Sequence, residues 1–179
     1  MIESPLTPEQ QRMLIAWQQH TYTEFALRDA QAALATMTEN PYVLLVPSGA
    51  GGEGRTAVLD FYAHSFLPYI PLDLELTPVS RIFGRSHLIE ESVVRFTHSV
   101  RMNWMLPGLE PTGRRVEFVL VGIVGLQNDR VAYEHLYWDQ GTVLSQLGVP
   151  SHPAAKSGIE SASALLRLTK RREVASAAR

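Results

Sequence analysis

The chain has 179 residues, a formal net charge of −2 and no cysteine. This length suits a single domain that buries its own core, and the lack of cysteine excludes disulfides, thiolate catalysis and zinc fingers. The nearly balanced charge favours neither nucleic acid nor an anionic membrane as a partner. The longest apolar run, residues 118–126, is much shorter than the ~20 residues of a membrane helix. We therefore expect a cytoplasmic protein.

The first part of the chain has the apolar spacing of helices. Residues 7–27 predict the first helix, because the Thr-Pro-Glu at its start supplies a cap, a proline suited to the first turn and an acid at the positive helix end. Further helices are expected over residues 29–37 and 56–67. Between them lie a short strand at residues 42–46 and the glycine-rich loop 47–54, which we expect to turn tightly at a pocket rim.

The second part of the chain has the alternating pattern of strands. Strands are expected over residues 74–83, 87–104, 115–126 and 131–140, followed by a closing helix over residues 142–147. Helices followed by antiparallel strands predict an α+β fold, with the N-terminal helices packed on one face of a curved sheet. We expect this domain to span residues 1–149. A linker and a detached helix with a basic, solvated end follow in residues 150–179.

Two strands suggest what their faces contact. His98 shares the apolar face of the strand over residues 87–104; it is either a core histidine with a hydrogen-bond partner or a pocket histidine. The strand over residues 115–126 is apolar on both faces and must be covered on both. Helices cover one face, and a second copy of the chain is the simplest cover for the other. This predicts a homodimer through the sheet.

The last expected strand mixes ionisable and aromatic side chains on both faces. One face carries Tyr133, His135, Tyr137 and Asp139, and the opposite face carries Glu134, Leu136 and Trp138. Such a mixture is typical of a pocket wall, and a polar dimer interface has the same composition. We interpret the Asp139 face as the pocket wall.

The segment 133–140, which reads YEHLYWDQ, and the Gln-Leu-Gly at 146–148 resemble the SnoaL-like polyketide cyclases of the nuclear-transport-factor-2-like superfamily. Further stretches resemble an uncharacterised subgroup of that type, so that the likeness covers residues 5–148; they are Pro41-Tyr42-Val43, Gly51-Gly52-Glu53-Gly54, Phe96-Thr97-His98, Trp104-Met105-Leu106-Pro107-Gly108 and Pro111-Thr112-Gly113. The resemblance implies a cone-shaped barrel of a strongly curved, mostly antiparallel sheet, with helices on its concave face. It also implies an interior pocket and a dimer.

The resemblance also implies site residues. Asp139 matches the aspartate that serves the characterised cyclases as general acid/base, and His98 or His135 would orient it or donate to an oxyanion. A capping role for Asp139 at the following helix stays open. The residues expected to shape the pocket are mostly aromatic, and the aromatic ones can equally be core; they are Trp17, Tyr42, Tyr62, Trp104, Glu134, Tyr137 and Trp138.

Two functions are open at this point. The first is a cofactor-independent acid/base enzyme of the cyclase, isomerase or hydrolase type, acting on a small apolar substrate that carries a carbonyl or a ring. The alternative is a non-catalytic ligand-binding or dimerisation domain, favoured because residues 123–125 are Ile-Val-Gly where the cyclases place a Gln-x-His pair. A small-molecule ligand is expected in either case, with no metal, nucleic acid or membrane partner.

Overall fold

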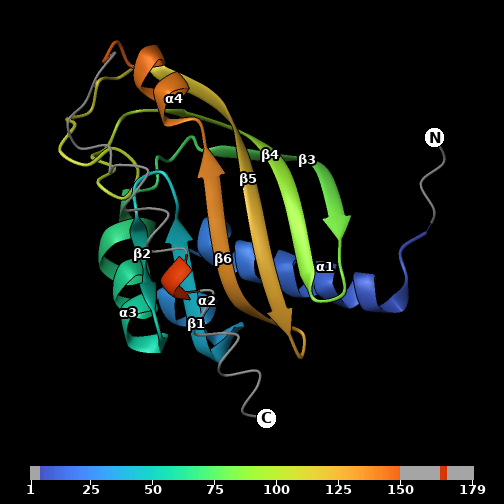
Figure 1. Ribbon diagram of the computed structural model, residues 1–179. Helices are drawn as coiled ribbons and strands as arrows, with labels where there is room; N and C mark the ends of the chain where they lie inside the picture. Colours follow the sequence, from blue (N-terminus) through green and yellow to red (C-terminus); the bar gives the residue numbers. More distant parts are fainter. Residues whose placement is uncertain (1–4, 150–165, 169–179) are drawn as a thin grey trace.

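The computed structural model describes residues 5–149 and 166–168. Helices and strands follow one another as α1 (Pro8–Thr21), the π-helical turn η1 (Tyr22–Ala26), α2 (Ala30–Ala35), β1 (Met37–Leu45), β2 (Ala50–Glu53), α3 (Arg55–Asp60), the π-helical turn η2 (Phe61–Phe66), the 3₁₀ turn η3 (Leu67–Tyr69), β3 (Glu75–Phe83), β4 (His87–Thr97), β5 (Arg115–Gln127), β6 (Arg130–Trp138) and α4 (Gln140–Gln146). Helices thus precede most of the sheet, as the sequence predicts (Figure 1).

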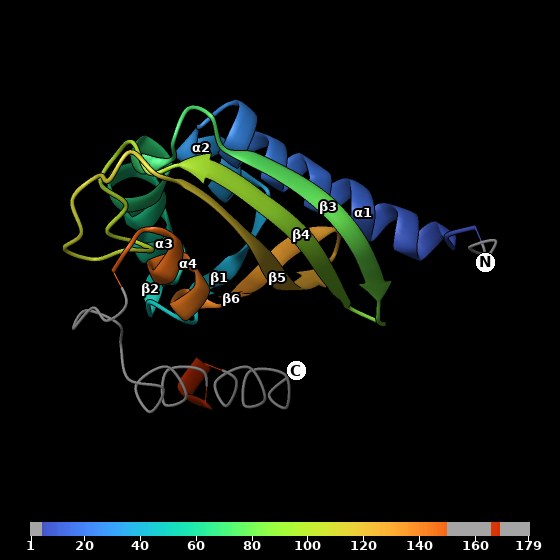
Figure 2. The same cartoon turned by 90° about the horizontal axis from the view of Figure 1, so that it is seen from above.

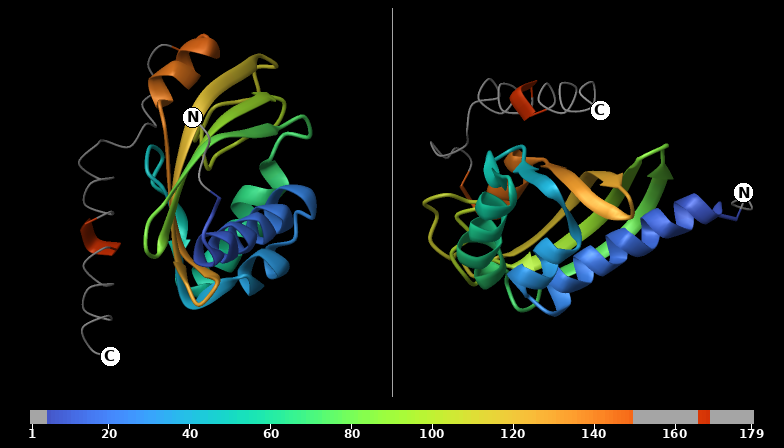
Figure 3. Two further views of the ribbon diagram at one scale, coloured as in Figure 1. Left: turned by 90° about the vertical axis from the view of Figure 1, so that its right-hand side faces the viewer. Right: turned by 90° about the horizontal axis from the view of Figure 1, so that it is seen from below.

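The strands form one sheet in the order β2-β1-β6-β5-β4-β3. Neighbours are antiparallel except β1 and β6, which are parallel. The sheet is strongly curved and stays open between its edge strands β2 and β3, so it resembles a cone without closing into a barrel (Figures 1 and 2). Helix α1 crosses its concave face (Figure 3). The predicted α+β class is therefore confirmed.

Local sequence explains where the first helix starts. The Thr7 side chain accepts a hydrogen bond from the Gln10 backbone N–H, and the Gln10 side chain accepts one from the Thr7 N–H. This reciprocal capping box and the proline at the first helical position fix the N-terminus of α1. The buried side of the helix then carries Met13, Trp17 and His20.

The strands differ from the predicted ranges mainly at β1, β2 and β4, and β2 lies within residues 47–54, which were expected to be a loop. The strand expected at residues 42–46 starts earlier, at Met37, and includes the Asn40-Pro41 pair. The register between β1 and β6 shifts between Met37 and Tyr42, and an irregularity of this kind is where a strand tolerates proline. β4 ends at Thr97; the residues up to 104, which the alternating pattern assigned to it, lie in the following loop.

Most buried apolar residues pack between the helices and the concave face of the sheet. A smaller cluster lies on the convex face, where Leu168 packs with Tyr42, Leu44 and Tyr133. The expected linker and most of the expected C-terminal helix lie outside the described residues, although 166–168 are helical. Among the described helices, none has the length and apolar character needed to cross a membrane.

Candidate active site

A cavity lies between the concave face of the sheet and the helical segments α1, η1 and η2. Its walls are mostly apolar, and three carboxylates open onto it: Glu24, Glu90 and Glu134. The cavity is narrow, with a volume of about 30 Å³. An apolar hollow with a few convergent polar groups is the usual form of a small-molecule site.

Both helical segments that close the cavity are π-helical. The Leu27 N–H donates to the Tyr22 carbonyl, and the Leu67 N–H donates to the Tyr62 carbonyl, so each bond spans five residues. One extra residue per turn rotates the side chains that follow, and such turns occur frequently at functional sites. Here they carry Glu24 in η1 and Tyr62 in η2, and both side chains line the cavity.

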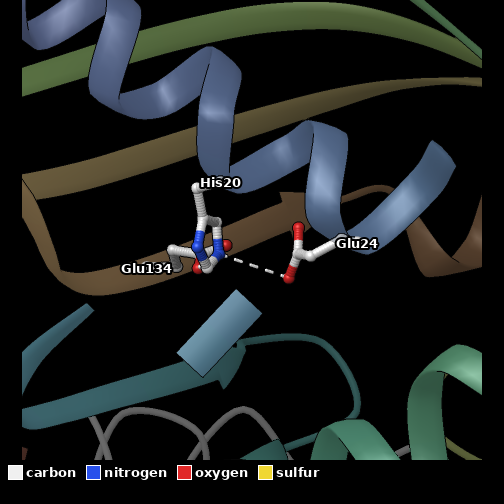
Figure 4. Close-up of side chains that lie close together, drawn as sticks. All are labelled: His20, Glu24 and Glu134. Carbon is white, nitrogen blue, oxygen red and sulfur yellow. Dashed lines mark ion pairs between the residues drawn. The ribbon is translucent and has the colours of Figure 1, made fainter. Parts of the chain in front are cut away.

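Three ionisable side chains, His20, Glu24 and Glu134, lie close together (Figure 4), and the two glutamates line the cavity. His20 Nε2 lies 2.8 Å from Glu134 Oε1 and 3.4 Å from Glu24 Oε1. His20 and Glu24 come from consecutive turns of the first helical segment, and Glu134 comes from β6. All three are buried, with exposed fractions of 0%, 3% and 2%. The Tyr62 hydroxyl donates to Glu134 Oε1 over 3.2 Å.

The neighbours of His20 determine which partner each ring nitrogen of its imidazole donates to. Its Nδ1 lies 2.6 Å from the hydroxyl of Thr36, and that hydroxyl donates its own proton to the Ala33 carbonyl at 2.7 Å. The hydroxyl oxygen is therefore the acceptor for Nδ1–H. This directs Nε2 to the carboxylates, where a second proton makes His20 an imidazolium. Hydrogen bonding on one ring nitrogen commonly sets the role of the other in this way.

The buried charges shift the pKa values of the cluster. Burial alone would lower the pKa of His20, but the negative charges of Glu24 and Glu134 and their hydrogen bonds outweigh it and raise the pKa to about 10. Burial raises the pKa of Glu24; repulsion from Glu134 adds to this, and the positive charge of His20 opposes it. The cluster therefore places a histidine that is charged near neutral pH beside two carboxyl groups, and the pKa of one of them, Glu24, is raised. Such a set is suited to proton transfer.

Within the part of the chain that the structure describes, the same three residues could also hold a metal. One ligand-type atom from each of His20, Glu24 and Glu134 lies within 4.8 Å of the other two. Imidazole and carboxylate groups suit several divalent cations. Glu90, the third carboxylate that lines the cavity, is bound differently, because it accepts a hydrogen bond from Arg81 Nε at 2.5 Å.

Asp139 lies away from the cavity. Its carboxylate caps α4, accepting from the Thr142 N–H at 3.2 Å and from the Thr142 hydroxyl at 2.5 Å. These hydrogen bonds lower the pKa of Asp139. The residues of β6 that line the cavity, Glu134 and Leu136, lie on the opposite face of the strand from the one interpreted as the pocket wall. That interpretation was wrong. Both faces of the strand have a mixed composition, so the sequence did not indicate which face the helices cover.

The two histidines expected beside Asp139 lie elsewhere. His98 is buried beyond the end of β4, and its Nδ1 accepts a hydrogen bond from the Thr112 N–H at 3.3 Å. His135 lies on the convex face of β6, where its ring packs against the Tyr133 ring at 4.9 Å and its Nε2 lies 3.0 Å from the Tyr42 hydroxyl. The structure therefore does not bring Asp139, His98 and His135 together.

The residues expected to shape the pocket divide into two groups. Trp17, Tyr62 and Glu134 line the cavity. The other four do not line it: Tyr42 and Tyr137 are on the convex face with His135, Trp104 packs edge-on against Phe66 at 4.9 Å, and the Trp138 Nε1–H donates to the Gln140 side chain at 2.5 Å.

Sequence reasoning missed His20, Glu24 and Glu90. A signal existed for the first two, because histidine and glutamate four residues apart on a helix share a face, and here that face also carries Trp17. For Glu90 the signal was its position two residues after Leu88 and two before Ser92, on the apolar face of the strand. A carboxylate at such a position needs a buried partner.

No protein-family model and no curated protein matches the chain. Its fold is nevertheless that of the SnoaL-like and nuclear-transport-factor-2-like proteins, as comparison with solved structures shows. One is a SnoaL-like protein from Jannaschia sp. CCS1 assigned as a polyketide cyclase, with a TM-score of 0.64 and 15% identity over 83% of this chain and 100% of that one.

Two other solved structures illustrate the range of proteins with this fold. A hypothetical protein with a ketosteroid isomerase-like fold from Catenulispora acidiphila DSM 44928, in complex with trimethylamine, has a TM-score of 0.57 and 16% identity over 81% of this chain and 96% of that one. The epoxide hydrolase/cyclase-like enzyme SalBIII, connected with pyran ring formation in salinomycin, has a TM-score of 0.55 and 18% identity over 76% and 97% of the chains. Identities this low show a shared fold and leave the reaction open.

Proposed function

We propose that the protein is an acid/base enzyme that transfers protons within a small, largely apolar substrate bound in the cavity. The observation that carries this proposal is the buried contact of His20 Nε2 with Glu134 at 2.8 Å and Glu24 at 3.4 Å. Buried ionisable groups with mutually shifted pKa values are characteristic of acid/base sites. Other proteins with this fold were crystallised with trimethylamine and with polyporic acid, which supports a small-molecule ligand here.

In the proposed reaction Glu134 is the base and Glu24 is the acid. The Glu134 carboxylate removes a proton from a carbon next to a carbonyl, and the protonated Glu24 gives its proton to the carbonyl oxygen, which yields the enol. In an isomerisation, Glu134 returns its proton to a carbon conjugated with the enol, and the enol O–H proton goes back to Glu24. In a ring closure, the enol carbon attacks a second carbonyl, whose oxygen takes the proton from Glu134 while the enol O–H proton goes back to Glu24. His20 and Tyr62 hold the Glu134 carboxylate by their hydrogen bonds.

This proposal replaces Asp139 as the acid/base. Asp139 is exposed and occupied with Thr142, which supports the capping role that the sequence left open. The absence of the Gln-x-His pair is also a weaker argument against an enzyme. Ile123 and Gly125 stand at the positions of that pair, and they lie on the face of β5 opposite to the core residue Val124. The ring of Tyr133 lies over Gly125, where an added Cβ would be 1.8 Å from it.

Exchange of carbon-bound hydrogen tests the proposal without a known substrate. A series of small cyclic and acyclic ketones is incubated with the protein in D₂O, and exchange next to the carbonyl is followed by proton NMR. We expect the wild-type chain to accelerate exchange of at least one ketone, and Glu134→Gln to lower that rate by roughly 100-fold. Asp139→Asn is the matched control and keeps the rate. Binding of ketones without any exchange would instead support the non-catalytic ligand-binding domain.

We also propose that two copies pair through the convex face of the sheet. Apolar side chains line up across β3, β4 and β5 on this face, in the register Ile82–Ile89–Ile123. Val119 on the same face is 56% exposed and Ile82 is 63% exposed. Exposed apolar side chains grouped on one face often mark an interaction surface, and pairing of the same face in two copies gives a twofold dimer.

A further inference from the structure

The cavity has more acidic groups than cationic ones. Of the three carboxylates that line it, Glu134 lies 2.8 Å from His20, and Glu90 is paired with Arg81. Glu24 shares the same His20 at a longer distance, 3.4 Å, and its other partner is the uncharged Tyr62 hydroxyl. Among the described residues, two cations therefore face three carboxylates, and one negative charge is left over at Glu24.

A buried surplus charge must be neutralised. When the cavity holds no cation, a proton on Glu24 does this, in agreement with the raised pKa of Glu24. A cationic ligand can take the place of that proton. The Glu24 carboxylate would then be its counter-ion, while Glu134 keeps His20 and Tyr62 as partners.

The walls around Glu24 are aromatic. Trp17 and Thr21 precede it on the helical segment, Phe25 follows it, and Phe61, Tyr62 and Phe66 approach from η2. Aromatic faces attract organic cations, most strongly where water is excluded. A hydrated metal ion gains little from such walls, whereas an ammonium group covered by alkyl carbons gains from both the walls and the carboxylate. The narrow space favours a ligand with few carbons.

We propose that the cavity binds a small alkylammonium ligand, with the Glu24 carboxylate as its counter-ion and the aromatic walls around its alkyl groups. This inference rests on the proposed function, because it names the substrate class of the same cavity. The substrate would carry an amine or quaternary ammonium group beside the carbon that loses its proton to Glu134. For such a substrate Glu24 stays ionised, and the neighbouring ammonium charge stabilises the enolate in place of a proton from Glu24.

Choline and its neutral isostere 3,3-dimethyl-1-butanol test the charge requirement in the full-length protein. By isothermal titration calorimetry at pH 7, we expect choline to bind at least about tenfold more tightly than the isostere. The nitrogen of choline is quaternary and has no proton, so choline adds a positive charge to the cavity without adding a proton. Its binding should therefore release about one proton, seen as a difference in heat between phosphate and Tris buffers. Equal binding of the two compounds, or choline binding without proton release, would overturn the proposal.

Variants assign the effect to Glu24. Glu24→Gln mimics the protonated side chain and should fold normally, yet it should weaken choline binding by about tenfold or more and abolish the proton release. Glu91→Gln, an exposed acid on the neighbouring position to Glu90, is the matched control and should change neither. Phe25→Leu keeps an apolar side chain but removes the aromatic ring, and should weaken binding several-fold. An unchanged affinity in Glu24→Gln would overturn the proposal, as would tight Mg²⁺ or Zn²⁺ binding that excludes choline.

The two proposals can fail separately. If ketone exchange depends on Glu134 but choline does not bind, the alkylammonium site is wrong and the acid/base function stands. If choline binds through Glu24 but neither neutral ketones nor trimethylammonioacetone exchange hydrogen, the ligand class stands and the acid/base function falls.

Discussion

Gly122 lies directly opposite Glu90 across the β4–β5 ladder, and it leaves the floor of the cavity without a side chain. On its other side it faces Leu136 of β6. A Cβ added at Gly122 would meet only Leu136 Cδ2, at 3.4 Å, which is an ordinary contact. The glycine is therefore required less for the fold than for the open space beside Glu90.

The first prediction follows from this open floor. Gly122→Leu should place an apolar side chain in the cavity and abolish ligand binding and ketone exchange, while the melting temperature stays the same or rises because a cavity is filled. Gly122→Ala is the control and should reduce binding only slightly. The measurements are calorimetric affinity, exchange by NMR and thermal unfolding by circular dichroism. Full binding by the leucine variant would show that ligands do not use this cavity.

The second prediction concerns stability against pH. The folded protein holds the His20 proton more tightly than the unfolded chain, because the pKa of His20 is raised to about 10 from an unfolded value near 6.5. Its stabilising contribution is complete below about pH 6.5 and is lost as the pH rises toward 10. The slope is at most ~1.4 kcal/mol per pH unit. The raised pKa of Glu24 acts in the same direction at lower pH.

Urea unfolding between pH 6 and pH 10 measures this effect. The free energy of unfolding of the wild-type chain should fall across the range, and His20→Gln should flatten the fall, since it removes the titrating group while Tyr62 continues to donate to Glu134. His64→Gln is the control, because His64 is exposed and pairs only with the exposed Asp60. Parallel curves for the wild type and His20→Gln would show that the buried cluster does not hold this proton.

The cluster also shows how far the sequence could lead. Periodicity predicted the α+β class and the helix that carries His20 and Glu24, because the apolar face of a helix recurs every three to four residues along the sequence. The face of β6 that lines the cavity could not be predicted in this way, since both faces of that strand mix ionisable and aromatic residues. The parallel pairing of β1 with β6, a long-range contact, puts Glu134 beside Val43 on the concave face. Strand alternation alone carries no information about such a pairing.

The third prediction separates capping from catalysis. Asp139→Ala removes the acceptor for the Thr142 N–H and hydroxyl and should lower the melting temperature by about 2–4 °C. Asp139→Asn, which can still cap, should have a smaller effect. Ligand affinity and ketone exchange should be unchanged in both variants, because Asp139 does not border the cavity. A loss of exchange in the asparagine variant, with its melting temperature intact, would return the acid/base role to Asp139.

The fourth prediction tests the convex face. Val119→Lys introduces a charge into the apolar row on β5 and should convert a dimer into a monomer, as measured by multi-angle light scattering at micromolar concentration. Ile15→Lys is the matched control, because Ile15 is similarly exposed but lies on α1, away from the convex face. A wild-type chain with a monomeric mass would contradict the predicted dimer.

The fifth prediction concerns the hydroxyl that fixes Glu134. Burial raises the pKa of Tyr62 well above its ordinary value, and the charges of Glu134 and Glu24 raise it further, so the hydroxyl stays protonated and donates to Glu134 throughout the working range. Tyr62→Phe keeps the buried ring and removes this donor. It should lower the free energy of unfolding by roughly 1–3 kcal/mol and slow ketone exchange by about tenfold or more, because the Glu134 carboxylate is less firmly oriented. Tyr22→Phe, at an exposed tyrosine of the same helical segment as Glu24, should change neither quantity. Exchange at the wild-type rate in Tyr62→Phe would mean that His20 alone positions the base.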